Sequence, residues 1–488
     1  MDILILLLML LATALLQLVF HANAAVLLAG GMATLCGLAL LYGQALGRYP
    51  VRLTWMMATG LLLGYGAGSF NTMLSYALSG FDAASALGLP SQYLSYGFFL
   101  VLAACAVLLA AGFFETPLFS YIECPAIDSR YERTLWISVA MIAFAYLHGD
   151  LGYEGVTISN QTDKVSVFGA LAISLPHVGF IFSSLGAVRS EGYKRWRMIL
   201  LALFHLGGIF PQSRRSLLYT IVSTGIVLSY MALKRVRLSL LRQVILAVSL
   251  VVALAFSAYL FMALRVEMDK IDAKASYDAK FAPIWVAGKG ALENAIFERQ
   301  EILARLRENV RDRTFIIRYI SLLGQGGETP EPMWGSDFWF SVRLVIPDAL
   351  YRLCGEDKTP LRNIGSEEGL INEHFGLPVY DEANSILTAG IADFGLPGVL
   401  IYPVLCCAAF GLLIKMTDPL VHPDCKLMIR ALMLNICMQA ESDIASYFMI
   451  MRNIYLIILL WSVLRSMPSF YLSKWTRDDA LKKQLQPL

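Results

Sequence analysis

The sequence predicts an all-α polytopic membrane protein, and three features support this fold class. Of the 488 residues, 57% are hydrophobic and 16% are charged, whereas soluble globular proteins carry about 25% charged residues. The mean hydropathy of +0.61 leaves more apolar surface than a soluble core can bury. The apolar residues also form long runs that basic loops separate. This composition excludes a soluble enzyme and a disordered scaffold, and the net charge of +2 gives no indication of a nucleic-acid partner.

Twelve apolar segments are candidate membrane helices, each of which needs about 20 apolar residues. With a cytoplasmic N-terminus, 20 Lys and Arg residues fall on the cytoplasmic side. The short outer loops then hold only Lys164, Arg214 and Arg215, which is a strong positive-inside signal. We therefore expect twelve spans with both termini in the cytoplasm. The spans are 3–20, 24–42, 53–78, 91–114, 134–148, 165–188, 196–210, 216–233, 243–264, 386–414, 427–440 and 444–464.

One long polar segment, residues 265–385, separates the ninth span from the tenth and lies outside by this orientation. Apolar residues at helical spacing predict one or two helices over 291–323 and a further helical stretch over 337–353. The segment is long enough to fold as a helical extracytoplasmic cap. The expected domains are a nine-span membrane domain (1–264), the cap (265–385), a three-span membrane domain (386–464) and a cytoplasmic tail (465–488).

The cysteines and histidines indicate neither a disulfide framework nor a metal site. Cys354 is the one cysteine in the cap segment, and no CxxC or Cys/His spacing in the chain suggests a metal site. His177 and His205 fall within spans, where we expect polar contacts between helices. We therefore expect no metal and no cofactor.

Two short motifs are interpreted as structural. Asp393-Phe394-Gly395 matches the metal motif of kinases, but it lies at the start of a membrane span. Gly60, Gly64 and Gly68 form a GxxxGxxxG face in the third span, which indicates close helix packing.

Arg214 and Arg215 lie in a short outward turn, where the topology disfavours basic residues. One interpretation is a pair of arginines whose side chains reach the interface. The other is an anion clamp, because guanidinium groups bind phosphate oxygens bidentately. The start of the following span would add the positive end of a helix dipole.

Four further arginines lie in apolar surroundings. Arg265 ends the ninth span, and Arg318 and Arg343 lie among apolar and aromatic cap residues, as they would on an interfacial helix. Arg452 falls inside the last span, where an ionisable group is costly and usually functional. A buried ion pair with Asp443 or Glu441 is the structural alternative for Arg452.

A candidate general base lies near the junction of the cap and the tenth span. His374 is followed by Asp381 and Glu382 just before that span. A histidine and two carboxylates in this position have the chemistry to accept a proton from a hydroxyl group. The alternative is ordinary solvated loop polarity. The aromatic stretch 334–340 either stacks on sugars or rests on lipid.

The order of these parts resembles the Wzy-type oligosaccharide repeat-unit polymerases of the O-antigen ligase and polymerase superfamily. The resemblance covers roughly residues 196–465. It rests on the Ser213-Arg214-Arg215 turn, the span ending at Arg265 before the large loop, the segment from Asn372 into Phe394-Gly395-Leu396-Pro397-Gly398, and the last span with Arg452. The sequence departs from the ligases at the start of the tenth span, where Glu382-Ala383-Asn384 replaces a His-Asn pair.

The resemblance implies a GT-C-like fold in the bacterial cytoplasmic (inner) membrane and a metal-independent glycosyltransferase. Its substrates would be undecaprenyl-diphosphate-linked glycans, joined on the outer face of the bilayer, and a chain-length regulator protein would be a partner. The diphosphate leaving group would be held by arginines: Arg214, Arg215, Arg265 and Arg452, with Arg318 and Arg343 as second-rank candidates. His374 or Glu382, with Asp381 beside it, would deprotonate the acceptor hydroxyl.

Four other functions remain open. An O-antigen ligase would share the fold and use a different acceptor. A transporter of polysaccharide or lipid-linked sugar also fits twelve spans, although the large loop divides them nine and three. A polyprenyl-phosphate-sugar glycosyltransferase would carry acidic residues in its first outer loop, but residues 21–24 hold none. The last alternative is a membrane scaffold whose loop recruits partners.

Overall fold

The computed structural model of the chain describes most of the predicted spans and much of the cap. The described residues are 2–80, 88–120, 127–148, 167–210, 214–231, 256, 259–264, 266–267, 290–291, 293–313, 316–324, 331–364, 366–377 and 384–466. Within these ranges the chain forms helices and no strand. The all-α fold class is therefore confirmed for the described part of the chain.

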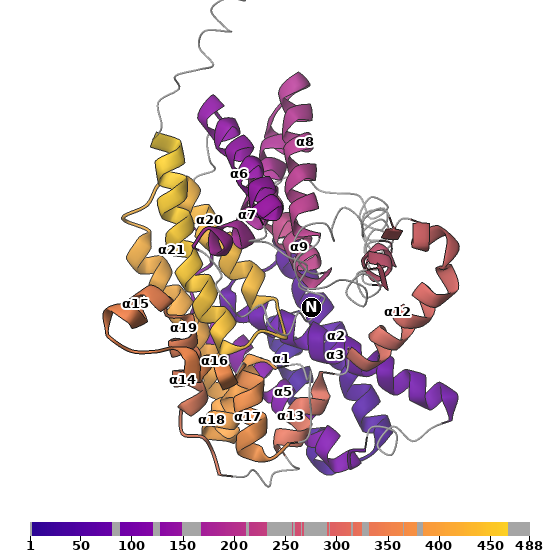
Figure 1. The fold of residues 1–488 in the computed structure, drawn as a ribbon. Helices are drawn as coiled ribbons and strands as arrows, with labels where there is room; N and C mark the ends of the chain where they lie inside the picture. The colour runs from indigo at the N-terminus through magenta and orange to yellow at the C-terminus, as the bar shows by residue number, and fades with distance from the viewer. Residues whose placement is uncertain are drawn as a thin grey trace, which may run out of the picture.

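The first group of helices comes from the predicted nine-span domain (Figure 1). These are α1 (Ile3–Val19), α2 (Asn23–Ala45), α3 (Leu53–Ser79), α5 (Ser91–Gly112), α6 (Ser129–His148), α7 (Val167–Arg189), α8 (Gly192–Ile209) and α9 (Arg214–Met231). They agree with the first eight predicted spans to within a few residues. Most of the ninth predicted span, 243–264, lies outside the described residues.

The second group forms the cap and the last membrane helices. The cap contains α12 (Arg299–Arg313), α13 (Ile317–Gly324), α14 (Ser336–Val345), α15 (Asp348–Leu353), α16 (Thr359–Ile364) and α17 (Glu367–Phe375). They are followed by α18 (Ile386–Phe394), α19 (Leu396–Thr417), α20 (Pro423–Cys437) and α21 (Ile444–Ser466). The helical character predicted for the cap is thus confirmed over its described parts.

Four described helical segments are long and apolar enough to cross a membrane: Asn23–Ala45, Ser91–Gly112, Leu396–Thr417 and Ile444–Val463. Ile3–Val19 and Ser216–Met231 are shorter apolar helices. A helix needs about 20 apolar residues to span the hydrocarbon core. The chain is therefore interpreted as a helical membrane protein.

The glycine face of α3 packs against the turn between α20 and α21. A Cβ atom on Gly60 would collide with the carbonyl group of Met438, and one on Gly64 would collide with Ala440. The packing predicted for Gly60 and Gly64 is confirmed, because only glycine allows backbone to approach this closely. Both glycines lie in the first half of α3, which begins on the predicted cytoplasmic side. The α20–α21 turn therefore packs against the first half of α3.

The tenth predicted span is wrong as a single helix over 386–414. The chain reverses at Gly395, which has a φ of +64° and a ψ of −148°, a conformation that favours glycine. A Cβ atom on Gly390 would lie 2.5 Å from the carbonyl oxygen of Gly398. In a continuous helix these two residues would lie about 12 Å apart. Helices α18 and α19 therefore form a tight hairpin, and only α19 is long enough to span.

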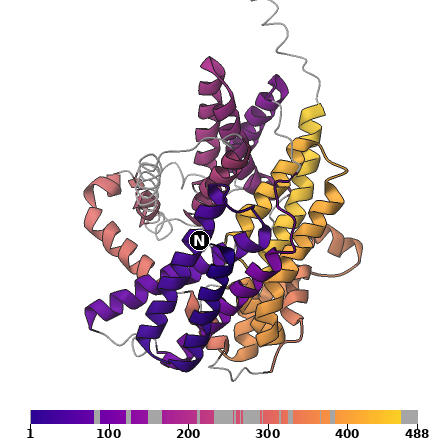
Figure 2. The same cartoon turned by 180° about the vertical axis from the view of Figure 1, so that it is seen from behind.

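Cap helices α14 to α17 gather around one end of α21, whereas α12 lies apart from them, beside α3 (Figure 1; Figure 2 shows the same arrangement from behind). Helix α14 packs against α21, α18, α17 and α16, whereas α13 packs against α5 and α18. The cap is thus seated directly on the last membrane helices.

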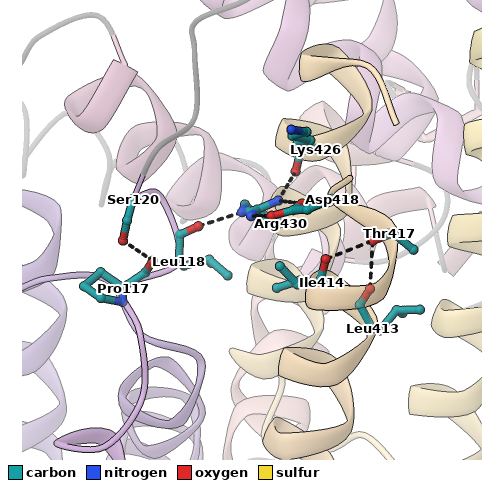
Figure 3. A network of polar contacts seen from close by, with 9 residues as sticks. All are labelled: Pro117, Leu118, Ser120, Leu413, Ile414, Thr417, Asp418, Lys426 and Arg430. Atoms are coloured by element: carbon teal, nitrogen blue, oxygen red, sulfur yellow. Dashed lines mark hydrogen bonds and ion pairs between the residues drawn. The ribbon is translucent and has the colours of Figure 1, made fainter. Parts of the chain in front are cut away.

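An ion pair joins buried Arg430 of α20 to half-buried Asp418 in the loop after α19 (Figure 3). The guanidinium of Arg430 is 4% exposed and donates to both carboxylate oxygens of Asp418, with Nη1 at 2.7 Å from Oδ1. Its Nε donates to the carbonyl oxygen of Leu118 at 2.7 Å. The contact fixes the loop after α19 against the chain that follows α5.

Candidate functional site: the junction of the cap and the last membrane helices

The arginines predicted to bind diphosphate fall on several elements. Arg214 and Arg215 are the first two residues of α9, and their side chains lie outside the described part of the structure. Arg265 also lies outside it. Arg318 lies in α13, where it is half-buried. Arg343 and Arg452 lie on α14 and α21, which pack together, so these two are brought to one junction.

Helices α14 and α21 run parallel along their contact. The ring of Phe338 near the start of α14 meets that of Phe448 near the start of α21, with centroids 5.4 Å apart. At the other end of α14, Nη1 of Arg452 donates to the carbonyl oxygen of Val345 at 2.9 Å. The last membrane helix and the cap are therefore held in register by a ring contact and an arginine.

Arg452 and Arg343 have polar partners at this junction. Nε and Nη2 of Arg452 both donate to Oδ1 of Asn453 at 3.2 Å. Arg343 Nε donates to the hydroxyl oxygen of Tyr351 at 3.2 Å. Among the described residues, Arg452 thus contacts neutral acceptors and forms no salt bridge with Asp443 or Glu441, the partners considered for it.

The predicted base lies at the edge of the cap. His374 is exposed in the last turn of α17, and its Nε2 lies 3.0 Å from the carbonyl oxygen of Glu331. Asp381 and Glu382 lie outside the described residues. His374 is accessible to a substrate, but its relation to the two carboxylates is not defined by the described part of the chain.

Four carboxyl groups gather where the amino-terminal ends of α14 and α21 meet. We call Asp337, Glu367, Asp393 and Asp443 the acidic centre. Asp393, at the end of α18, accepts the backbone N–H groups of Asp337 at 2.9 Å and Phe338 at 2.8 Å. It also accepts the hydroxyl of Tyr402 at 2.6 Å. Asp393 therefore caps α14 and ties it to the α18–α19 hairpin.

Glu367 performs the same role for α21. Its carboxylate accepts the backbone N–H groups of Ala445 at 2.8 Å and Ile444 at 3.2 Å. The side-chain amide of Asn384 donates to it at 3.1 Å, and the hydroxyl of Ser341 also donates to it. A carboxylate at a helix amino terminus satisfies amide groups that have no partner within the helix. Glu367 thus links α17, α14 and α21.

Asp337 differs from its neighbours because its side chain caps nothing. The residue is fully buried, and neither carboxyl oxygen has a hydrogen-bond partner among the described residues. Burial, followed by the nearby charges of Asp393 and Asp443, raises the pKa of Asp337 to about 8. At neutral pH this carboxyl is therefore mainly protonated.

The pKa of Glu367 is also raised well above its ordinary value. Burial is the main cause, followed by the charges of Asp443 and Asp337. The amide groups of Ala445 and Ile444 act in the opposite direction, because they stabilise the ionised carboxylate. Carboxyl groups with raised pKa values at the junction of two domains are typical of functional sites.

A chain of polar side chains leads from the membrane helices to this junction. His177 Nδ1 lies 2.6 Å from Oγ1 of Thr220, which accepts the side-chain amide of Asn435 at 3.1 Å. Gln439 donates to Asn435 at 2.9 Å and accepts the hydroxyl of Ser442 at 3.3 Å. The path connects α7 and α9 to the α20–α21 turn, where Asp443 begins the next helix. The interhelical role predicted for His177 is confirmed.

His205 is likewise an interhelical polar group, as predicted. It is fully buried, with Nε2 2.6 Å from the hydroxyl oxygen of Ser138 and Nδ1 2.7 Å from the carbonyl oxygen of Leu201. Both ring nitrogens thus have partners within the bundle.

Sequence patterns did not reveal the acidic centre. Asp337 and Glu367 both stand in the first turn of a helix, where acidic residues are common and usually solvated. Their burial depends on α21 and α18, which are distant in the sequence. The aromatic neighbours of Asp337, residues 338–340, are the one local signal that pointed to burial.

Comparison with known proteins adds no assignment, since no family model, curated protein or solved structure matches the chain. Among the described residues, no group of three or more His, Cys, Asp or Glu side chains is arranged to hold a metal ion. We therefore describe the acidic centre through its hydrogen bonds and the protonation of its carboxyl groups.

Proposed function

We propose that this protein polymerises undecaprenyl-diphosphate-linked oligosaccharide repeat units on the outer face of a bacterial cytoplasmic membrane. The proposal includes the twelve-span topology with cytoplasmic termini and a GT-C-like arrangement of the membrane helices. The observation that carries it is the contact of Arg452, within the last membrane helix, with cap helix α14, which also bears Arg343. This contact supports the proposal, because guanidinium groups at the junction of membrane helix and cap could bind a lipid-borne diphosphate.

The proposed reaction is a substitution at the anomeric carbon of the donor glycan. The acceptor hydroxyl oxygen bonds to that carbon, and the bond from the carbon to the diphosphate oxygen breaks. The leaving undecaprenyl diphosphate gains the negative charge, which Arg452, Arg343 and the arginines at the start of α9 would stabilise. The hydroxyl proton passes to His374 or to Glu382 with Asp381. Asp337 is too deeply buried to meet an acceptor in this conformation.

The direct test uses the purified full chain in lipid with a defined undecaprenyl-diphosphate oligosaccharide. We expect a ladder of longer glycans, with or without a chelator. Replacement of Arg452 by Ala should slow chain growth by about 10²–10³-fold, the usual loss when one charge-stabilising donor is removed. Arg452→Lys should rescue poorly, because an ammonium group cannot reproduce a planar fork.

Arg195→Ala is the matched control, since Arg195 is exposed on the predicted cytoplasmic side. It should leave the ladder unchanged. Normal chain-length distributions in Arg452→Ala and Arg343→Ala together would remove the arginine clamp from the proposal. If the ladder formed only on a lipid A-core acceptor, the protein would be a ligase instead.

A second candidate function is the transport of a lipid-linked sugar. The broken α18–α19 helix and the buried carboxyl groups favour it, because interrupted helices and buried ionisable groups are common in transporter binding sites. The two functions are separated by liposomes loaded with the same oligosaccharide lipid. Movement of the lipid between leaflets without any ladder would support transport and contradict polymerisation.

A further inference from the structure

We propose that the acidic centre is a proton-binding site, and that its protonation keeps cap helix α14 docked on membrane helix α21. The inference concerns the junction itself and holds whether or not the chain is a polymerase. The two carboxyl oxygens of Asp337 are fully buried and lack hydrogen-bond donors within the described structure. An ionised carboxylate in that position would carry an unpaired buried charge, which is strongly unfavourable.

The groups that face Asp337 are themselves acidic. Helix α18 contributes Asp393, helix α17 contributes Glu367, and Asp443 lies at the start of α21. Each of these three already accepts backbone N–H groups of a helix amino terminus. Their positions are thus fixed by capping, and they cannot move away when Asp337 ionises. Repulsion between fixed carboxylates then acts on α14, the helix that carries Asp337.

The described basic groups around α14, namely Arg343, Arg452 and Lys358, contact its carboxy-terminal end and do not neutralise the centre. Tyr402 of α19 donates its hydroxyl to Asp393. Arg343 and Arg452 lie at the opposite end of the α14–α21 contact and bond to Tyr351 and to Val345. Helix α16 contributes Arg362, whose side chain lies outside the described residues. A proton is therefore the ligand that the described groups best accommodate.

Because α14 and α21 are parallel, repulsion at the acidic centre acts to separate the two helices. Both helices begin at the acidic centre, and the Phe338–Phe448 contact lies one residue beyond Asp337 in α14. When the cap is docked, Asp337 is held away from water; when α14 separates from α21, the carboxyl becomes solvated. Protonation therefore favours the docked state, and deprotonation favours the separated state.

The direction of the pH effect follows from the two pKa values of Asp337. In the docked state its pKa is raised from the ordinary 3.8 to about 8. Between these values the docked form holds a proton that the separated form has released, so docking weakens as the pH rises. Above about pH 8 both forms are ionised, and the loss is complete. One proton changes the docking equilibrium by up to about tenfold per pH unit across this window.

The test is hydrogen–deuterium exchange of the full chain in nanodiscs from pH 5 to pH 9, corrected for intrinsic exchange rates. We expect protection of residues 336–345 and 444–450 to fall by up to about tenfold per pH unit as the pH rises. Protection of helix α5 should stay constant, which distinguishes separation of the cap from unfolding. Asp337→Asn is neutral at every pH. The decrease of protection with pH should therefore lose the contribution of one titrating proton.

Glu356→Gln is the matched control, because Glu356 is an exposed carboxyl in the same cap. It should keep the wild-type slope. Wild-type protection that does not change with pH would overturn the proposal, whatever the folding of the variants. So would a full wild-type slope in Asp337→Asn, or an equal loss of protection in α5. None of these results depends on glycan synthesis, so failure here leaves the proposed function untouched.

Discussion

At the scale of single residues, hydrogen-bond partners decide what identical side chains do. Asp393 and Asp337 are both fully buried aspartates, yet Asp393 accepts two backbone N–H groups and a hydroxyl. Asp337 has no such donors among the described residues. The first is therefore a helix cap that joins two parts of the chain, and the second is the group whose proton we expect to respond to pH.

Arg430 shows the same dependence for a positive charge. Its guanidinium is buried and shared between Asp418 and the carbonyl oxygen of Leu118. Arg430→Ala removes these charge-assisted hydrogen bonds and should lower the free energy of unfolding by about 1.5–3 kcal/mol. Thermal or denaturant unfolding in detergent measures the change. Arg195→Ala, at an exposed position, should change stability by less than about 0.5 kcal/mol; equal effects in the two variants would refute this assignment.

At the scale of elements, close backbone approach shapes the region between the cap and the last spans. The reversal at Gly395 lets α18 return along α19, and α18, at nine residues, is about 14 Å long. The hairpin places Ser385 where its hydroxyl oxygen lies 2.7 Å from that of Tyr65 in α3. A short helix buried in this way carries Asp393 to the amino terminus of α14.

Two glycines of α19 provide a matched test of this hairpin. A Cβ atom on Gly398 would collide with the backbone of Gly390, so Gly398→Ala should destabilise the protein by about 1–3 kcal/mol. A Cβ atom on Gly411 would meet nothing within 4 Å. Gly411→Ala should therefore be neutral or stabilise by up to about 1 kcal/mol, because alanine favours the helix. A stable Gly398→Ala protein would contradict the tight crossing.

At the scale of the whole molecule, the cap is an extension of the last membrane helices. Glu367 caps α21, Asp393 caps α14, and Arg452 bonds to the end of α14. Changes in the cap are thereby transmitted to the membrane helices through hydrogen bonds to backbone groups. The proposed reaction would require such a connection, because both parts would contact one substrate at the boundary of lipid and water.

Cys354 tests the orientation of the whole chain. It is exposed after α15, whereas Cys36, Cys105 and Cys425 are buried. If the cap lies outside, a membrane-impermeant maleimide should label intact spheroplasts at Cys354, and Cys354→Ser should abolish that labelling. Labelling of Cys354 only after permeabilisation would reverse the predicted topology.

The helices and their approximate bounds follow largely from the amino-acid sequence. Apolar runs predicted the eight helices of the first group and also α20 and α21, since burial in lipid requires a continuous apolar surface. Helical spacing predicted the cap helices within 291–323 and 337–353, whereas α16 and α17 were not predicted. The glycines of α3 also revealed close packing, because their spacing alone defines a face without side chains.

The reversal at Gly395 and the composition of the acidic centre depend on contacts between segments that are distant in the sequence. Hydropathy measures how apolar a segment is and carries no information about the direction of the chain. The adjacent apolar helices α18 and α19 were therefore predicted as one span. Asp337, Glu367, Asp393 and Asp443 come from segments separated by up to about 100 residues. Whether an acidic residue in a first helical turn is solvated or buried depends on which distant helix covers it, and the local sequence is the same in both cases.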